Sequence, residues 1–458
     1  MLKTLSIYTL LSSLAFSLLG QTIAITGVTV IDPGSRAVSP NQMVVVEAGV
    51  IRSVEKFTGR APKGAREING KGRYLIPGLW DSHVHLTKIG ESALPLFIAN
   101  GVTSVRDVGS NLEEVASWRA QIESGSRLGP RIRTSGQILE SKANFERMLM
   151  EGGVEPYARI RIPIANPGDA QAAVRRLAAA GADHIKLRTS PDFSSFRAAI
   201  EEAHRLGLRV AAHAVATPEQ LIEARLDSVE HFLAFPSLAS KAAFEREALF
   251  KKLAQSGLFM SPTISNIGPI LMPYEESKRR LNDDKGRLDF RRKFVHGYLV
   301  EDWKEQIEEK REGYSAAIAK ELPNLYNDLK GLYAAGVRFL AGTDVAVVFM
   351  YPGFSLHDEL AALVHQVGLT PMDALRAATY NPTLYFRNDK IIGSIQKGFV
   401  ADLVLLDADP LANIANTQRI CGVISRGRWF DRSSLNELLK KAALPMRSPH
   451  RPKLSATK

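Results

Sequence analysis

The feature that most constrains the fold is an alternation of short apolar segments with helical segments between residues 77 and 390. The helical segments carry apolar residues at helical spacing, for example at 173–178 and 360–367. This alternation predicts an α/β fold with a parallel sheet, and a (β/α)8 barrel of the TIM type is a common solution. We place the barrel strands at residues 79–85, 103–108, 131–135, 183–187, 209–213, 228–231, 259–263 and 338–344.

Both ends of the chain have a different pattern. Residues 21–76 and 391–435 contain short β-branched stretches separated by turn residues such as Asp32-Pro33-Gly34, and we expect strands outside the barrel there. Residues 271–330 are charged and helical in pattern, which predicts a helical insertion within the 77–390 domain. Such an insertion can act as a lid or consist of ordinary surface helices, and the sequence leaves both readings open.

The extreme N-terminus predicts export. Residues 1–20 contain Lys3 followed by an apolar run, which is typical of a signal peptide rather than a buried helix or an uncleaved anchor. We therefore expect a secreted or periplasmic protein with no stable membrane insertion after cleavage. The single cysteine, Cys421, forms no internal disulfide, and its apolar surroundings indicate a structural thiol.

The charge balance brings nucleic acid into consideration. The net charge is +11, but basic residues alternate with acidic ones along most of the chain. The basic tail, residues 436–458, has no aromatic side chain on which bases could stack. We expect a small-molecule substrate and no nucleic-acid partner, and the sequence leaves homo-oligomer formation open.

Candidate metal ligands lie at the ends of the predicted strands. His83 and His85 are two positions apart in one strand, so both side chains point to the same face. Four further residues fall on other barrel strands: Lys186, His213, His231 and Asp344. Each alone is compatible with a core or capping role. Together they predict a Zn²⁺ or similar divalent site at the carboxyl end of the barrel, where such enzymes place their active sites.

Two further residues are candidates for substrate binding. Arg188 lies two positions after Lys186, where its guanidinium could bind a substrate carboxylate or form a salt bridge on the barrel rim. His357 lies near the start of the last barrel helix, where it could line the loop after Asp344 or serve only the helix.

These motifs, in this order, resemble the metal-dependent amidohydrolase superfamily, in its imidazolonepropionase-related, Xaa-Pro dipeptidase-like branch. The resemblance rests on 77–85 (PGLWDSHVH), Lys186, His213, Glu230-His231 and Gly342-Thr343-Asp344, and it continues through 369–382 and 393–404. It covers nearly all of the chain after residue 20. It implies that the two β-rich ends join into a small β-sandwich beside the barrel.

The resemblance also implies a binuclear centre. His83 and His85 would bind one metal with Asp344, while His213 and His231 would bind the second. Lys186, carboxylated by CO2, would bridge two divalent ions, with zinc the favoured metal. A hydroxide held by these ions would attack the substrate, and Asp344 would be the catalytic base and acid.

The expected activity is hydrolysis of an amide C–N bond in a small molecule such as a dipeptide or an N-acyl amino acid. The chain departs from the dipeptidase-like pattern at 136–140 (GQILE) and 213–215 (HAV), so Xaa-Pro specificity does not carry over. The alternatives are a cyclic-amide hydrolase or deaminase of the same superfamily and a catalytically silent binding protein on this scaffold.

Overall fold

The computed structural model describes residues 21–150, 158–231, 241–295, 297–308 and 314–443. The predicted signal peptide and residues 444–458 of the predicted tail lie outside this part of the chain. Among the described helices, none combines the length and apolar character that crossing a bilayer requires.

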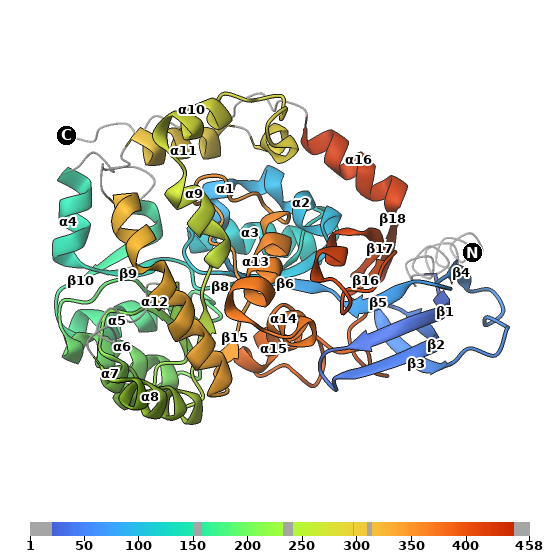
Figure 1. Ribbon diagram of the computed structural model, residues 1–458, viewed down its shortest axis with the longest axis horizontal. Helices are drawn as coiled ribbons and strands as arrows, with labels where there is room; N and C mark the ends of the chain where they lie inside the picture. Colours follow the sequence, from blue (N-terminus) through green and yellow to red (C-terminus); the bar gives the residue numbers. More distant parts are fainter. Residues whose placement is uncertain (1–20, 151–157, 232–240, 296, 309–313, 444–458) are drawn as a thin grey trace, which may run out of the picture.

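The two ends of the chain join in one mixed sheet, at the right of Figure 1. Its strands are β1 (Ile23–Asp32), β2 (Ala37–Glu47), β3 (Val50–Lys56), β4 (Arg66–Asn69), β5 (Tyr74–Pro77), β16 (Leu403–Leu406), β17 (Ile420–Ser425) and β18 (Arg428–Asp431). The order is β18-β17-β16-β5-β1-β2-β3, with β4 beside β1. Strand β5 pairs antiparallel with β16, which joins segments more than 300 positions apart. The described strands of both chain ends belong to this one sheet, and the expected β-sandwich stays a prediction.

The central strands form two parallel sheets. One contains β6 (Leu79–Val84), β7 (Val102–Asp107) and β8 (Arg131–Thr134); the other runs β10 (Arg161–Ile164), β9 (Ile138–Ser141), β11 (Ile185–Leu187), β12 (Val210–His213), β13 (Ser228–Glu230), β14 (Phe259–Ser261) and β15 (Arg338–Phe339). Each of the eight expected barrel segments contains a strand. Strands β9 (ILES) and β10 (RIPI) were not expected from the sequence.

Main-chain hydrogen bonds connect the two parallel sheets, although their strands do not form one continuous ring in this topology. On one side, Ser82 N donates to Ala341 O at 2.8 Å, and Val84 forms a bridge with Val345. On the other side, Asp183 N donates to Thr134 O at 2.8 Å. These bonds bring the carboxyl ends of strands from both sheets to one end of the molecule.

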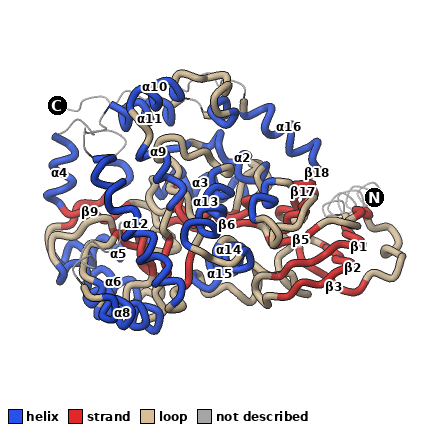
Figure 2. The backbone as a smooth tube through the Cα atoms, in the orientation of Figure 1, coloured by secondary structure: helices blue, strands red, loops and turns tan. Residues whose placement is uncertain are grey.

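Helices surround the parallel strands (Figure 2). They are α1 (Leu86–Ile89), α2 (Leu94–Ala99), α3 (Leu112–Glu123), α4 (Lys142–Met150), α5 (Pro167–Ala179), α6 (Phe193–Arg205), α7 (Pro218–Glu223), α8 (Ala243–Gln255), α9 (Ile267–Leu271), α10 (Tyr274–Leu281), α11 (Tyr298–Glu308), α12 (Tyr314–Ala334), α13 (Ser355–Ala362), α14 (Pro371–Ala377), α15 (Tyr380–Tyr385) and α16 (Arg432–Ala442). Polar N-caps begin several of them: the side chain of Asn166 accepts from Asp169 N, and Thr217 forms a capping box with Gln220. The predicted tail, which starts at residue 436, begins inside α16. Leu435 of this helix is buried.

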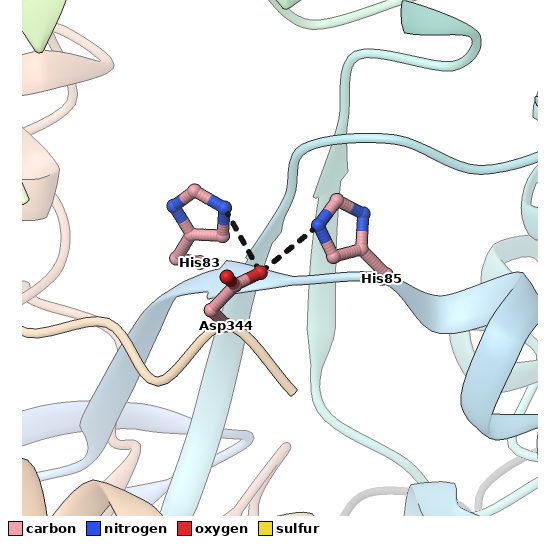
Figure 3. Close-up of side chains that lie close together, drawn as sticks. All are labelled: His83, His85 and Asp344. Atoms are coloured by element: carbon pink, nitrogen blue, oxygen red, sulfur yellow. Dashed lines mark ion pairs between the residues drawn. The ribbon is translucent and has the colours of Figure 1, made fainter. Parts of the chain in front are cut away.

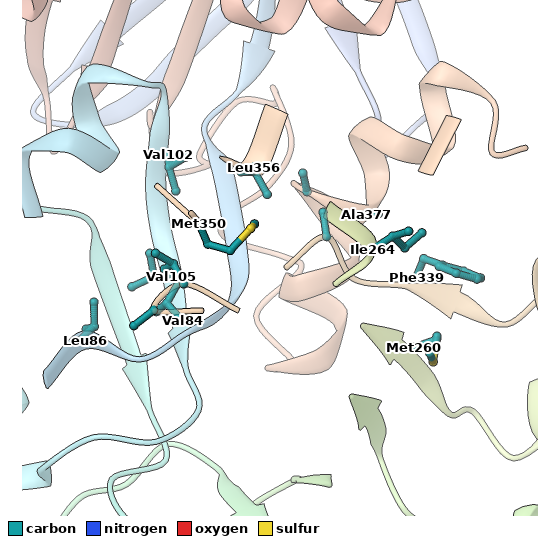
Figure 4. Packing of buried hydrophobic residues seen from close by; sticks show 14 of the residues in the cluster. Val84, Leu86, Val102, Val105, Met260, Ile264, Phe339, Met350, Leu356 and Ala377 are labelled. Carbon is teal, nitrogen blue, oxygen red and sulfur yellow. The ribbon is translucent and has the colours of Figure 1, made fainter. Parts of the chain in front are cut away.

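Apolar side chains from strands and helices make one large core (Figure 4). Val84 and Val105 come from the three-stranded sheet, Met260 and Phe339 from the seven-stranded sheet, and Leu356 from α13. The described part of 271–330 is helical as expected, and Trp303 of α11 is fully buried. Its indole Nε1 donates to Ala346 O at 3.2 Å, so the insertion packs on the loop that follows Asp344.

Candidate metal centre

The predicted ligands converge at the carboxyl ends of the parallel strands. His83 lies near the end of β6, His213 ends β12, and Lys186 lies inside β11. A cavity of ≈ 270 Å³ at this point is lined by five of the six predicted ligands: His85, Lys186, His213, His231 and Asp344. His83 lies immediately beside them, because its Nε2 is 3.5 Å from Asp344 Oδ1.

Three of these side chains form a compact group (Figure 3). The rings of His83 and His85 both point toward the Asp344 carboxylate, and His85 Nε2 lies 3.2 Å from its Oδ1. The three potential ligand atoms all lie within 4.8 Å of one another, so one metal ion could contact all of them. Gly342 permits this approach, since a Cβ there would lie 2.7 Å from the Cβ of His83.

His213 and His231 form a second pair. Their Nε2 atoms lie 3.1 Å apart, and His231 Nδ1 is 3.6 Å from Asp344 Oδ2. Two imidazole lone pairs repel at this distance unless a proton or another cation lies between them. The pair therefore suits a cation. Asp344 is close to His231 of this pair and to both histidines of the first group.

The Nδ1 atoms of three histidines contact other parts of the protein. His83 Nδ1 lies 2.7 Å from Glu230 Oε2, His85 Nδ1 donates to Gly109 O at 3.1 Å, and His231 Nδ1 lies 3.0 Å from Thr263 Oγ1. Such outer contacts set the ring orientation of metal-binding histidines. In His83 and His85 they leave Nε2 facing Asp344.

The backbone at the site is unusual. His231, Thr263 and Asp344 have φ angles of 73°, 51° and 59°, in the left-handed region that side chains other than glycine rarely adopt. Buried Asp81 holds the loop before Asp344: its Oδ1 accepts from Thr343 N at 3.0 Å and its Oδ2 from Thr343 Oγ1 at 2.7 Å. Non-glycine residues in this conformation concentrate at functional sites.

Burial sets the protonation states. It lowers the pKa of Lys186 to about 8 and holds the pKa values of His83 and His213 well below the ordinary value. Burial opposes ionisation of Asp344, but the neighbouring His231 and His83 hold the pKa of its carboxyl well below the usual range. Neutral imidazoles, a carboxylate and a readily deprotonated amine suit a divalent metal.

Two buried nitrogens support that fit. Within the described residues, neither Lys186 Nζ nor His83 Nε2 has a hydrogen-bond partner. An unsatisfied buried polar group lowers the stability of a folded protein by about 1–3 kcal/mol. A ligand, an ion or a covalent modification at these two atoms would remove that penalty. The donor set therefore fits the metal centre that the sequence predicts.

The two predicted substrate residues have different positions. Arg188 lines the cavity. Its Nη1 also lies 3.1 Å from Oε2 of buried Glu140, so the same side chain both faces the site and forms a salt bridge. His357 lies near the start of α13, as one of the two readings of the sequence has it. It is buried with Nδ1 3.0 Å from Thr417 Oγ1 and Nε2 donating to Asn100 O at 3.1 Å, and it does not line the cavity.

Other cavity residues were missed in the sequence. Arg161 is the first residue of the unexpected strand β10, and Ile138 is the first residue of the unexpected strand β9. Gln306 comes from α11. Lys88 also lines the cavity and pairs with buried Asp302 of α11 at 3.1 Å. The apolar pair Ile138-Leu139 was a weak signal for β9. Nothing in the local sequence indicates that α11 reaches the cavity.

Comparison with known proteins identifies the family. The chain matches the Amidohydrolase family over residues 74–430, and a match over most of its length shows that it belongs to this family. Ochratoxinase from Aspergillus niger is 25% identical over 436 residues, covering 83% of this chain and 80% of that protein.

Solved structures confirm the resemblance at the level of the fold. An Xaa-Pro dipeptidase with bound methionine has a TM-score of 0.68 at 21% identity, covering 90% of this chain and 100% of that chain. The crystal structure of A. niger ochratoxinase has a TM-score of 0.66 at 21% identity, covering 90% and 96%. The predicted amidohydrolase resemblance, including its dipeptidase-like neighbours, is therefore confirmed.

Proposed function

We propose that this chain, which belongs to the Amidohydrolase family, is a metal-dependent hydrolase of an amide C–N bond in a small molecule. The observation that carries the proposal is the convergence of His83, His85 and Asp344 with the buried, unpartnered Lys186 amine on one cavity. We also propose that the two parallel sheets together make the (β/α)8 barrel typical of the family, since hydrogen bonds connect them on both sides.

His83, His85 and Asp344 would hold one divalent ion, and His213 with His231 a second. Lys186 would join the two as a carbamate, because a protonated amine cannot bind a cation and a carbamate offers two anionic oxygens. The lowered pKa of Lys186 favours the neutral amine that reacts with CO2. Bound divalent ions supply Lewis acidity and lower the pKa of water.

Asp344 is the proposed proton carrier. Its carboxylate lies between the two histidine pairs and borders the cavity. Held ionised by its neighbours, it accepts a proton from the water that adds to the substrate carbonyl. It then delivers that proton to the nitrogen as the C–N bond breaks, so that the amine leaves neutral.

Arg188 would select the substrate. Its guanidinium is about one-third exposed, and Glu140 holds it from behind. Lys88, Arg161 and Lys186 also line the cavity, where Asp344 is the acidic lining residue. This basic lining favours a substrate with a carboxylate next to the amide, such as a dipeptide or an N-acyl amino acid. The names of the ochratoxinase and dipeptidase relatives are consistent with amide substrates.

The test is a hydrolysis assay on purified protein loaded with Zn²⁺ in the presence of bicarbonate. The panel contains dipeptides, N-acyl amino acids, and the same compounds with the carboxylate amidated. We expect cleavage of the free acids, loss of cleavage on chelation, and loss in Asp344→Asn. Cleavage only of cyclic amides, or release of ammonia from amino-heterocycles, would replace this proposal with the corresponding alternative activity. Metal binding without turnover of any substrate would favour a binding protein.

A further inference from the structure

We infer that Glu230 is a positioning residue that holds the His83 ring with its proton on Nδ1 and its Nε2 lone pair toward the site. The inference rests on the proposed function in one respect, namely that His83 is a metal ligand. It concerns a residue that does not line the cavity and has no part in the proton transfers proposed above.

The contact between the two side chains is short and buried. Glu230 ends β13, His83 lies near the end of β6, and both side chains are fully buried. Glu230 Oε2 is 2.7 Å from His83 Nδ1. An ionised carboxylate only accepts hydrogen bonds, so the imidazole must carry its hydrogen on Nδ1. In a neutral ring, Nε2 then keeps its lone pair.

The carboxylate of Glu230 is itself fixed from two sides. Arg106 of β7 donates through Nη2 to both carboxylate oxygens, at 2.9 and 2.7 Å, and Ser228 Oγ donates to Oε1 at 2.6 Å. Arg106 is anchored in turn, because its Nε donates to Ser82 O at 2.5 Å. A buried carboxylate that accepts charge-assisted hydrogen bonds from an arginine is favoured in its ionised form and cannot rotate freely. Strands β6, β7 and β13 therefore meet in this one network.

His83 has a particular need for such a partner. Its Nε2 has no hydrogen-bond partner among the described residues, and Asp344 Oδ1 lies 3.5 Å away, beyond the usual hydrogen-bond range, so the shorter contact at Nδ1 selects the tautomer. The corresponding Nδ1 contacts of His85 and His231 are longer and involve uncharged oxygens of Gly109 and Thr263. Charge-assisted hydrogen bonds are roughly twice as strong as neutral ones. Glu230 thus provides the strongest of the three.

A purely structural role is the alternative, in which the ion pair of Glu230 with Arg106 joins β7 to β13 and does nothing for His83. A measurement of the His83 tautomer distinguishes this role from positioning. Histidines are labelled with ¹⁵N, and long-range ¹H–¹⁵N spectra of the metal-free protein report which ring nitrogen carries the proton. The His83 signal is identified from its loss in His83→Asn. We expect the Nδ1–H form in the unmodified protein.

Glu230→Gln is the decisive variant. It removes the negative charge and puts an NH2 donor where one carboxylate oxygen accepts hydrogen bonds, so the hydrogen bond to His83 is no longer charge-assisted and the Nδ1–H form should lose its dominance. Zn²⁺ affinity, measured by competition with a chromogenic chelator, should fall about 10- to 100-fold. Glu359→Gln is the matched control: Glu359 is equally buried, and within the described residues its carboxylate accepts from Ser265 N and not from a histidine. It should change neither readout.

Glu230→Asp is the second variant, for the case in which Glu230→Gln does not fold. It keeps the charge for Arg106 but withdraws the carboxylate by one methylene, about 1.5 Å, and should loosen the tautomer in the same direction. An Nε2–H ring in the unmodified protein would overturn the inference, as would unchanged tautomer and Zn²⁺ affinity in a folded Glu230 variant. The tautomer readout needs no metal and no substrate, so failure of amide hydrolysis leaves this test intact.

Discussion

Glu359 of α13 should make the stability of this protein depend on pH. Its side chain is fully buried; Oε2 accepts from Ser265 N at 2.7 Å, and Oε1 has no hydrogen-bond partner among the described residues. Burial raises the pKa of this carboxyl from 4.5 to about 7. The folded protein therefore keeps the proton at pH values where the unfolded chain has released it.

The sign and size of the effect follow from this difference. Because the folded pKa is above the unfolded value, the stabilisation is complete below about pH 4.5 and is lost as pH rises through about 7. A difference of about 2.5 pKa units corresponds to at most about 3 kcal/mol of unfolding free energy. Glu359→Gln cannot ionise, so this part of the pH dependence should disappear in the variant.

The assay is urea unfolding of metal-free protein at pH 5, 6.5 and 8. Wild-type protein should lose more unfolding free energy between pH 5 and pH 8 than Glu359→Gln does. A poorly paired amide lowers the stability of the variant equally at every pH and does not alter the slope. Glu55→Gln on β3, at an exposed position, is the control. Parallel pH profiles for wild-type protein and Glu359→Gln would refute the reasoning.

Three further predictions concern the site. Lys186→Ala removes the amine that would be carboxylated, so metal content should fall and activity should drop by about 100-fold or more; full metal content measured by atomic absorption would contradict this. Gly109→Ala would place a Cβ 2.5 Å from Ile138 Cδ1 and 3.0 Å from His85 Nδ1. We expect this crowding to lower the unfolding free energy by about 1–3 kcal/mol and to weaken Zn²⁺ binding. An unchanged melting temperature would contradict this prediction. Arg188→Ala should raise KM for substrates with a free carboxylate, by about 10-fold or more, and leave their amidated analogues unaffected; equal changes in steady-state kinetics for both classes would contradict the carboxylate role.

The strand segments and the ligand set were predictable because both follow local rules. A buried parallel strand requires a short apolar run, and most of the eight segments contain one, although 131–135 (RIRTS) and 228–231 (SVEH) each have a single apolar residue. His83 and His85 share a face because side chains alternate along a strand. The order of the remaining motifs then identified the family.

The outer contacts of the site were not predictable in the same way. Glu140 lies in β9, a strand that was not expected, so its salt bridge with Arg188 could not be inferred from the sequence. Gln306 is one polar residue among many on α11, and only packing against the loop after Asp344 brings it to the cavity. The sequence left two readings open for His357, and its buried contacts with Thr417 and Asn100, which depend on tertiary packing, place it outside the cavity lining.

The sequence by itself determined the α/β class, the positions of the central strands and the chemical types of the proposed metal ligands. Local periodicity and motif order carry that information. The tertiary structure alone decided which residue contacts the Nδ1 atom of each proposed histidine ligand: Glu230 for His83, Gly109 for His85 and Thr263 for His231. These partners are up to 147 positions apart in sequence. Their contacts depend on strand order and on the left-handed turns at the strand ends, which no local pattern encodes.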